Sequence, residues 1–65
     1  MKIKPKNDYK LLGTSIQLDP NKVYDAEHAT NQPDWEKHKK IFVLDVDDYG
    51  GSFMLGDGDY QIIED

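Results

Sequence analysis

The sequence contains no cysteine and no arginine, and no long run of apolar residues. Without cysteine the chain has no disulfide bonds, and we expect a reducing compartment, the cytoplasm, as its location. No stretch approaches the ~20 consecutive apolar residues of a membrane-spanning helix. The lysine-rich start has no apolar segment behind it, so we expect no signal peptide. Without arginine, the chain lacks the planar group that binds phosphates and guanine edges in a bidentate way.

The chain has 65 residues, which is enough for one domain. A domain of this size buries only about 60% of the surface of its unfolded chain, so its margin of stability is thin. We expect a monomer or a weak homodimer, since oligomerisation is a second source of stability. Much of the core must come from the aromatic residues, which are Tyr9, Tyr24, Trp35, Phe42, Tyr49, Phe53 and Tyr60.

Charge is divided unevenly along the chain. All eight basic residues are lysines that precede residue 41, whereas seven acidic residues and no basic residue follow from there on. The formal net charge is −5. Because nucleic acids are polyanions, this distribution disfavours DNA or RNA binding by the C-terminal half.

Residues 41–63 read as three strands joined by two short turns. Residues 41–46 are rich in β-branched and aromatic residues, and the strands expected at residues 52–55 and 60–63 follow them. Glycine and aspartate fill the segments between them, which is typical of tight turns. Side chains alternate between the two faces of a strand. We therefore expect an inward face that includes Tyr24, Phe42, Leu44, Phe53 and Ile62, with Val46, Leu55 and Ala26 on the same side.

The first half of the chain predicts shorter elements. Residues 1–7 alternate lysine with apolar residues and contain Pro5, which has no backbone donor, so we expect an extended, flexible arm. Short strands are predicted at residues 9–12, 15–18 and 23–28. Asp19-Pro20 predicts a turn between the last two. Residues 29–40 predict a loop, in which Asp34 would cap a single helical turn.

These patterns resemble an SH3-like small β-barrel. The segment VDDYGGSF resembles its tight distal hairpin, GDGD its glycine-rich turn, and YQII its brief last strand. KVYDA resembles the second strand, and residues 29–40 the loop that follows. The resemblance implies an all-β fold, a single SH3-like barrel of about five short antiparallel strands.

The chain departs from the peptide-binding SH3 domains. It lacks their ALYDY-type motif and has one tryptophan instead of an adjacent pair, so we do not expect a groove for proline-rich peptides. The chain is also similar in style to short proteins of phages and mobile elements of Gram-positive bacteria, a similarity that implies no activity.

Residues 45–50 partly match a calcium-binding loop. Such a loop needs oxygen ligands at its fifth and twelfth positions, where this chain has Tyr49 and Gly56. His28 and His38 do not have the spacing of a zinc site. We therefore expect solvated turn aspartates and surface histidines, with no metal or other cofactor. Weak cation binding between the two aspartate-rich turns is the alternative.

No arrangement of side chains predicts catalysis, and we expect that the protein is not an enzyme. Ser15 and Ser52 fall in predicted strands without an activating partner. The GDGD segment would present carboxylates to a phosphate, which repel it. A domain this small also has little room for a buried cleft.

Trp35 and Tyr49 are the strongest candidates for binding residues, with Tyr9 as a third. Both lie in predicted loops, where exposed aromatics often anchor interfaces; the alternative is that Trp35 folds back to close the core. The sequence predicts a non-catalytic protein-interaction module. An acidic inhibitor or nucleic-acid mimic, acting on a basic groove of a host protein, is a second hypothesis. A weak nucleic-acid binder that uses the N-terminal lysines is a third.

Overall fold

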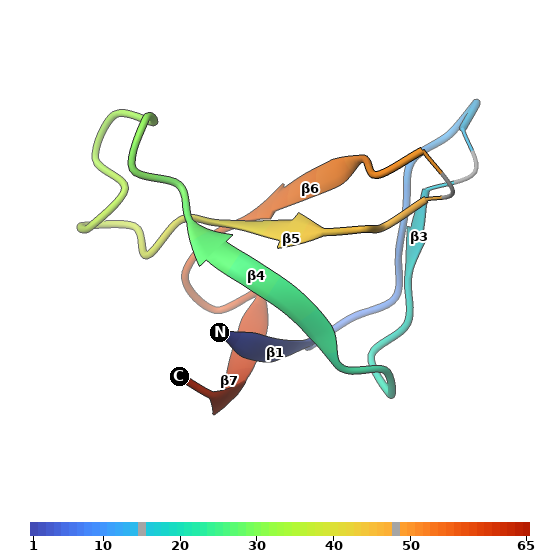
Figure 1. The fold of residues 1–65 in the computed structure, drawn as a ribbon, viewed down its shortest axis with the longest axis horizontal. Helices are drawn as coiled ribbons and strands as arrows, with labels where there is room; N and C mark the ends of the chain where they lie inside the picture. The colour runs from blue at the N-terminus through green and yellow to red at the C-terminus, as the bar shows by residue number, and fades with distance from the viewer. Residues whose placement is uncertain (15, 48) are drawn as a thin grey trace.

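The computed structural model describes residues 1–14, 16–47 and 49–65 (Figure 1). Ser15, in a predicted strand, and Asp48, in a predicted turn, lie outside these residues. All regular structure in the described part of the chain is β-strand, which confirms the all-β prediction. The strands are β1 Lys2–Pro5, β2 Tyr9–Lys10, β3 Gln17–Leu18, β4 Tyr24–His28, β5 Ile41–Leu44, β6 Ser52–Leu55 and β7 Tyr60–Glu64.

Five of the strands form one antiparallel sheet with the order β6-β5-β4-β1-β7. The strands β4, β5 and β6 follow one another along the chain. β1 pairs with β4 on one side and with the last strand, β7, on the other, so β7 lies at the opposite end of the sheet from β6. β2 and β3 pair separately as a short hairpin. Among the described residues the edge strands β6 and β7 do not pair with each other, so the sheet does not close into a barrel.

The core lies on one face of this sheet. Tyr24 and Ala26 are buried, as predicted. Leu18 of the separate hairpin packs into the same cluster. Phe53 is only half-buried and packs at the margin of the cluster. The cluster consists of Ile3, Leu18, Tyr24, Ala26, Ile41, Val43, Val46 and Leu55.

The inward face of β5 is opposite to the predicted one. Ile41 and Val43 are fully buried, whereas Phe42 and Leu44 are half-buried. Val43 pairs with Ala26, and directly opposed residues share a face of the sheet. The prediction was wrong because it extended this strand to residue 46, whereas β5 ends at Leu44, before Asp45.

The predicted strand included Asp45, which alternation assigns to the same face as Ile41 and Val43. Its polar side chain made the face of Ile41 and Val43 appear to turn toward solvent. In the structure Asp45 follows β5 and has a left-handed backbone with φ 54°. This conformation ends the alternation of the strand, and Val46 is again buried.

The predicted N-terminal arm is a strand inside the sheet. β1 lies between β4 and β7, and Ile3 is fully buried. Pro5 is the last residue of β1 and pairs with Tyr60. The pairing of β1 with β4 is at Lys2 and Ile3, so Pro5 lies beyond it, where β1 is locally an edge and proline is tolerated.

Candidate functional site

A hollow of ≈ 410 Å³ opens between loop 29–40 and strand β7. Loop 29–40 extends from one end of β4 and β5, and β7 lies at the edge of the sheet (Figure 1). Aromatic and apolar groups form much of the lining, together with one acidic and one basic side chain. The lining residues are His28, Trp35, Glu36, Lys39, Tyr60 and Ile62.

Loop 29–40 is closed by its own backbone. The Ala29 N–H donates to the Lys40 carbonyl at 3.0 Å, and the Lys40 N–H donates to the Trp35 carbonyl at 2.9 Å. Asp34 and Lys39 have left-handed backbones, with φ of 56° and 48°. Residues 34–40 therefore form successive hydrogen-bonded turns in place of a regular helix.

Trp35 is half-buried and packs against the end of β4. Its ring centroid lies 5.4 Å from that of His28, with 48° between the two ring planes. Trp35 is not a member of the core cluster. It therefore does not close the core, which was the alternative prediction for this residue. The indole is one of the side chains that line the hollow.

Tyr60 connects loop 29–40 to β7. Its hydroxyl donates to the Lys39 carbonyl at 2.8 Å. Close by, the Asp57 N–H donates to the His38 carbonyl at 2.7 Å. Burial, and to a smaller extent the negative charge of Asp57, raises the pKa of Tyr60. The phenol therefore keeps the proton of this hydrogen bond up to a higher pH than a free tyrosine does.

Ile62 lies on the predicted face but at the uncovered edge of the sheet. It pairs with the buried Ile3, which places it on the core side. Because β7 is the last strand, Ile62 remains 49% exposed, and the prediction that it is buried is wrong. The register shifts between Lys2 and Ile3 and leaves Ile63 as an extra residue, which is 46% exposed.

The three predicted binding residues do not form one surface. Tyr49 is 93% exposed in the hairpin beyond β5, whereas loop 29–40, which contains Trp35, lies at the opposite end of that strand (Figure 1). Tyr9 is half-buried: its hydroxyl donates to Asp59 Oδ1 at 3.2 Å, and its ring lies 6.0 Å from that of Phe53. Only Trp35 lines the hollow. Sequence reasoning did not connect it with Tyr60 or Ile62, because no local pattern joins residues that far apart.

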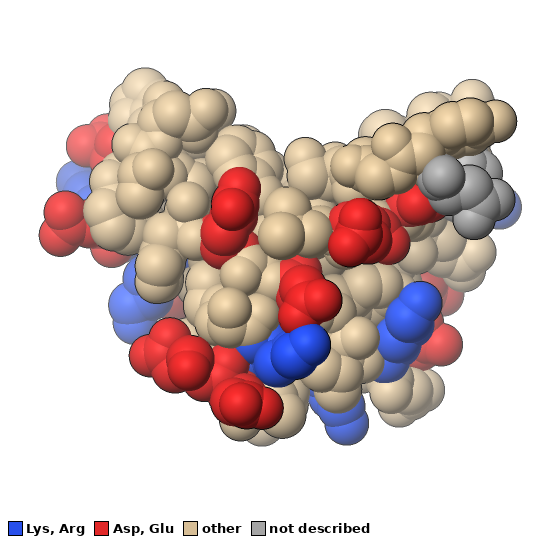
Figure 2. All heavy atoms as spheres, in the orientation of Figure 1, with Lys and Arg blue, Asp and Glu red and all other residues tan. Residues whose placement is uncertain are grey.

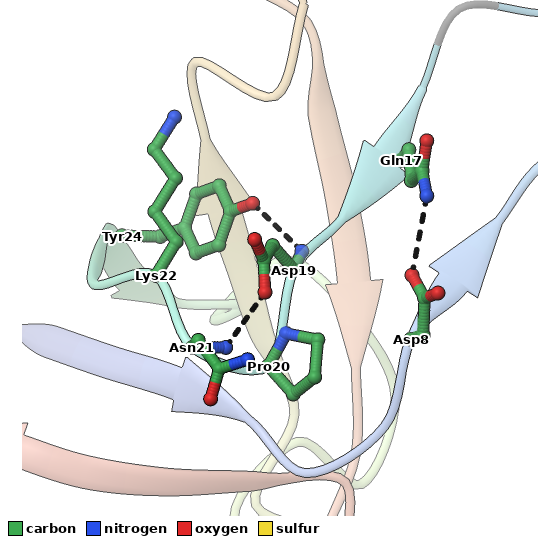
Figure 3. A pocket seen from close by; sticks show the side chains of 7 residues that line it. All are labelled: Asp8, Gln17, Asp19, Pro20, Asn21, Lys22 and Tyr24. Atoms are coloured by element: carbon green, nitrogen blue, oxygen red, sulfur yellow. Dashed lines mark hydrogen bonds between the residues drawn. The ribbon is translucent and has the colours of Figure 1, made fainter.

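A second hollow, of ≈ 520 Å³, is formed by the predicted Asp19-Pro20 turn (Figure 3). The Lys22 N–H donates to the Asp19 carbonyl at 3.1 Å, which confirms the turn. The Asp19 carboxylate accepts from the Asn21 N–H at 2.8 Å, and the Tyr24 hydroxyl accepts from the Asp19 N–H at 2.9 Å. The Lys22 ammonium lies 5.1 Å from the centre of the Tyr24 ring. The polar groups of residues 19–24 thus stabilise the turn itself, whereas Gln17 and Asp8, which also line the hollow, are hydrogen-bonded to each other.

Carboxylates in the two aspartate-rich turns bind backbone N–H groups. Asp47 Oδ1 accepts from the N–H groups of Tyr49 and Gly51, at 2.9 and 2.8 Å. Asp59 Oδ2 accepts from the Gly56 N–H at 3.2 Å. Within residues 1–14, 16–47 and 49–65, no three His, Cys, Asp or Glu side chains are grouped to hold a metal ion.

Acidic side chains are spread over the face drawn in Figure 2, with a few lysines between them. Lys2 forms an ion pair with Asp25. The hydrogen bond from Lys2, and then its positive charge, lowers the pKa of the Asp25 carboxyl. Lys2, one of the N-terminal lysines of the nucleic-acid hypothesis, is therefore paired with a carboxylate of the neighbouring strand β4.

The chain matches no protein-family model, no curated protein and no solved structure. Among the described residues, no helix has the length and apolar character needed to cross a membrane.

Proposed function

We propose that this protein is a small, non-catalytic protein-interaction module that binds an apolar side chain of its partner in the hollow beside Trp35. The observation that carries the proposal is the position of Trp35. The indole is half-buried, lies beside the His28 ring, and lines the hollow together with Tyr60 and Ile62. A tryptophan held in this way loses little conformational freedom when a partner covers it, and such residues dominate binding energy at interfaces.

We further propose that the fold is an SH3-like arrangement in which the barrel stays open. Its support is the order of elements along the chain. Loop 29–40 separates β4 from β5, a tight hairpin joins β5 to β6, and a glycine-rich turn precedes the short β7. Residues 22–26 contribute to the second strand of the large sheet in chain order, as the resemblance implies.

Binding can be followed with the fluorescence of Trp35, which is the single tryptophan of the chain. A partner would first be isolated on the immobilised protein, and its dissociation constant then measured by calorimetry for the wild type and for Trp35→Ala. We expect Trp35→Ala to weaken binding by about 30-fold or more, as loss of an anchor residue does. The wild-type emission should shift on binding, since the indole becomes covered.

Met54→Ala is the matched control, because Met54 is 45% exposed on β6 and does not line the hollow. We expect its affinity to stay within about threefold of the wild type. Circular dichroism and thermal melting of each variant separate loss of binding from loss of fold. A folded Trp35→Ala protein that binds as the wild type does would refute the proposal.

The second candidate function is an acidic inhibitor or nucleic-acid mimic. It is favoured by the seven acidic residues after residue 40 and by the acidic side chains visible across one face (Figure 2). Ionic strength distinguishes the two functions. Affinity of a mimic should fall steeply as salt is added, whereas a contact anchored by Trp35 should change little.

A further inference from the structure

We infer that Asp57-Gly58 is a site of spontaneous backbone modification, at which the aspartyl bond isomerises to an isoaspartyl bond and loosens the attachment of loop 29–40 to β7. The reaction needs no enzyme and no reagent except water. It goes beyond the proposed function, because it concerns the chemistry of this chain alone and requires no partner.

The reaction passes through a cyclic imide. The Gly58 backbone nitrogen attacks Cγ of the protonated Asp57 carboxyl, so an N–Cγ bond forms, the N–H proton is lost and one water leaves. Water then opens the five-membered ring, and nothing is oxidised or reduced. Opening at Cγ restores the aspartyl bond. Opening at the main-chain carbonyl leaves a free α-carboxylate and a backbone that runs through Cβ and Cγ, which is the isoaspartyl bond.

Both reacting groups are accessible in the structure. Asp57-Gly58 is the single Asp-Gly or Asn-Gly pair of the chain, and both of its residues are exposed. A glycine nitrogen is open to attack because no side chain shields it, and a Cβ added at Gly58 would meet no atom within 4 Å. Across the residues that the structure describes, no hydrogen bond or ion pair involves the Gly58 N–H or the Asp57 carboxylate. Ring closure therefore breaks no existing bond of either group.

Asp59 provides the contrast within the same turn. Its Oδ1 accepts from the Tyr9 hydroxyl at 3.2 Å, and its Oδ2 accepts from the Gly56 N–H at 3.2 Å. The next residue is Tyr60, which has a bulky side chain and pairs with Pro5 in the sheet. A carboxylate held by two donors and followed by a bulky residue should remain aspartyl. The turn thus contains one reactive and one protected aspartate.

The isoaspartyl product loosens the attachment of loop 29–40. Two donors on either side of the modified bond, the Asp57 N–H and the Tyr60 hydroxyl, reach consecutive carbonyls of this loop at 2.7 and 2.8 Å. The new bond adds one main-chain atom between Asp57 and Gly58, so the spacing of the two donors changes. Hydrogen bonds weaken steeply when distance and angle depart from their preferred values, and at least one of the two should be lost.

Incubation of the folded protein in water enriched in heavy oxygen, at physiological temperature and pH, measures the reaction. Each ring opening leaves one heavy oxygen in the residue, and mass spectrometry locates it. Only the isoaspartyl product has its Cα–Cβ bond in the main chain, where electron-based fragmentation cleaves it. We expect heavy oxygen and isoaspartate to accumulate over weeks at Asp57 and not at Asp59. A wild type without label at Asp57, or labelled equally at both residues, would overturn the inference.

Asp57→Glu is the matched control, because it keeps the charge and the backbone N–H but would need a six-membered ring, which closes far more slowly. It should remain unlabelled at this position. Acrylamide quenching of Trp35, the single tryptophan, then reports on loop 29–40. Quenching should increase with the isoaspartate fraction of the wild type and stay constant in Asp57→Glu aged alongside. Label in Asp57→Glu equal to that of the wild type, or isoaspartate that rises while quenching stays constant, would overturn the inference. Neither measurement uses a partner, so the proposed function can fail independently.

Discussion

Two loops lie at opposite ends of β5, and they are stabilised in different ways. Loop 29–40 is bound to distant parts of the chain: the Lys39 and His38 carbonyls accept from Tyr60 and Asp57. The hairpin after β5 is instead stabilised within itself, because Asp47 Oδ1 accepts two N–H groups of the same turn. Each loop carries one predicted binding residue, Trp35 or Tyr49.

The difference explains why only one of these loops forms a site. The hydrogen bonds of loop 29–40 to Tyr60 and Asp57 hold it beside β7. Tyr60 and Ile62 of β7 then line a hollow together with Trp35. Tyr49 lines neither of the two hollows and is 93% exposed. A loop bound by distant contacts creates a concave surface, whereas a hairpin stabilised by its own aspartate presents a convex tip.

The largest expected effect comes from removing the carboxylate that stabilises the hairpin. Asp47→Ala leaves the N–H groups of Tyr49 and Gly51 without their acceptor and should lower the free energy of unfolding by about 1–2 kcal/mol. The melting temperature would fall by roughly 4–8 °C for each kcal/mol lost. Thermal melts followed by circular dichroism measure this change.

Asp47→Asn is the control, since its side-chain oxygen can still accept both bonds, and it should retain most of the stability. Gly51→Ala tests the same contact from the other side, because a Cβ there would lie 2.7 Å from Asp47 Oδ2. Equal stability of Asp47→Ala and the wild type would show that the hairpin is not stabilised locally, and the comparison of the two loops would fail.

A smaller effect is expected where loop 29–40 is bound to β7. Tyr60→Phe removes the hydrogen bond to the Lys39 carbonyl and should cost about 0.5–1 kcal/mol, because this bond lies at the surface. Hydrogen exchange should become faster at the amides of Lys40 and Asp57, and stay unchanged at Gly51. Faster exchange at Gly51 would indicate that the two loops are not independent.

The same contrast determines how much could be predicted from the sequence. The Asp19-Pro20 turn follows from local turn chemistry, and the inward face of β4 from alternation. Strand β1 did not follow, because Lys2–Pro5 is recognisable as a strand only beside β4 and β7. The face of β5 was misjudged because the left-handed backbone of Asp45 is not visible in the pattern of residues.

Of the residues that line the hollow, Trp35 alone was predicted from the sequence as a binding residue. Trp35 was selected because it lies in a loop, but its surroundings come from β4 and β7. Tyr60 was assigned to the last strand, and nothing in the sequence indicates its hydrogen bond to Lys39. Sites built from distant strands depend on register and on which strand lies at the edge, and both are properties of the whole sheet.

The smallest expected effect is a dependence of stability on alkaline pH. The pKa of Tyr60 is raised in the folded protein, mainly by burial and then by Asp57, whereas an unfolded tyrosine titrates near pH 10. The folded state therefore holds the phenolic proton more tightly. Its contribution is fully present below about pH 10 and is lost as the pH rises through the folded pKa.

Urea unfolding of the wild type and of Tyr60→Phe at pH values from about 8 to about 11 isolates this contribution, since lysine titration affects both proteins alike. The difference in unfolding free energy between the two should be constant up to about pH 10 and shrink above it. A difference that stays constant, or grows, would mean that Tyr60 ionises at least as readily in the folded chain as in the unfolded one. Loop 29–40 would then not depend on the neutral phenol, and its stabilisation would have to come from the backbone bonds of the loop alone.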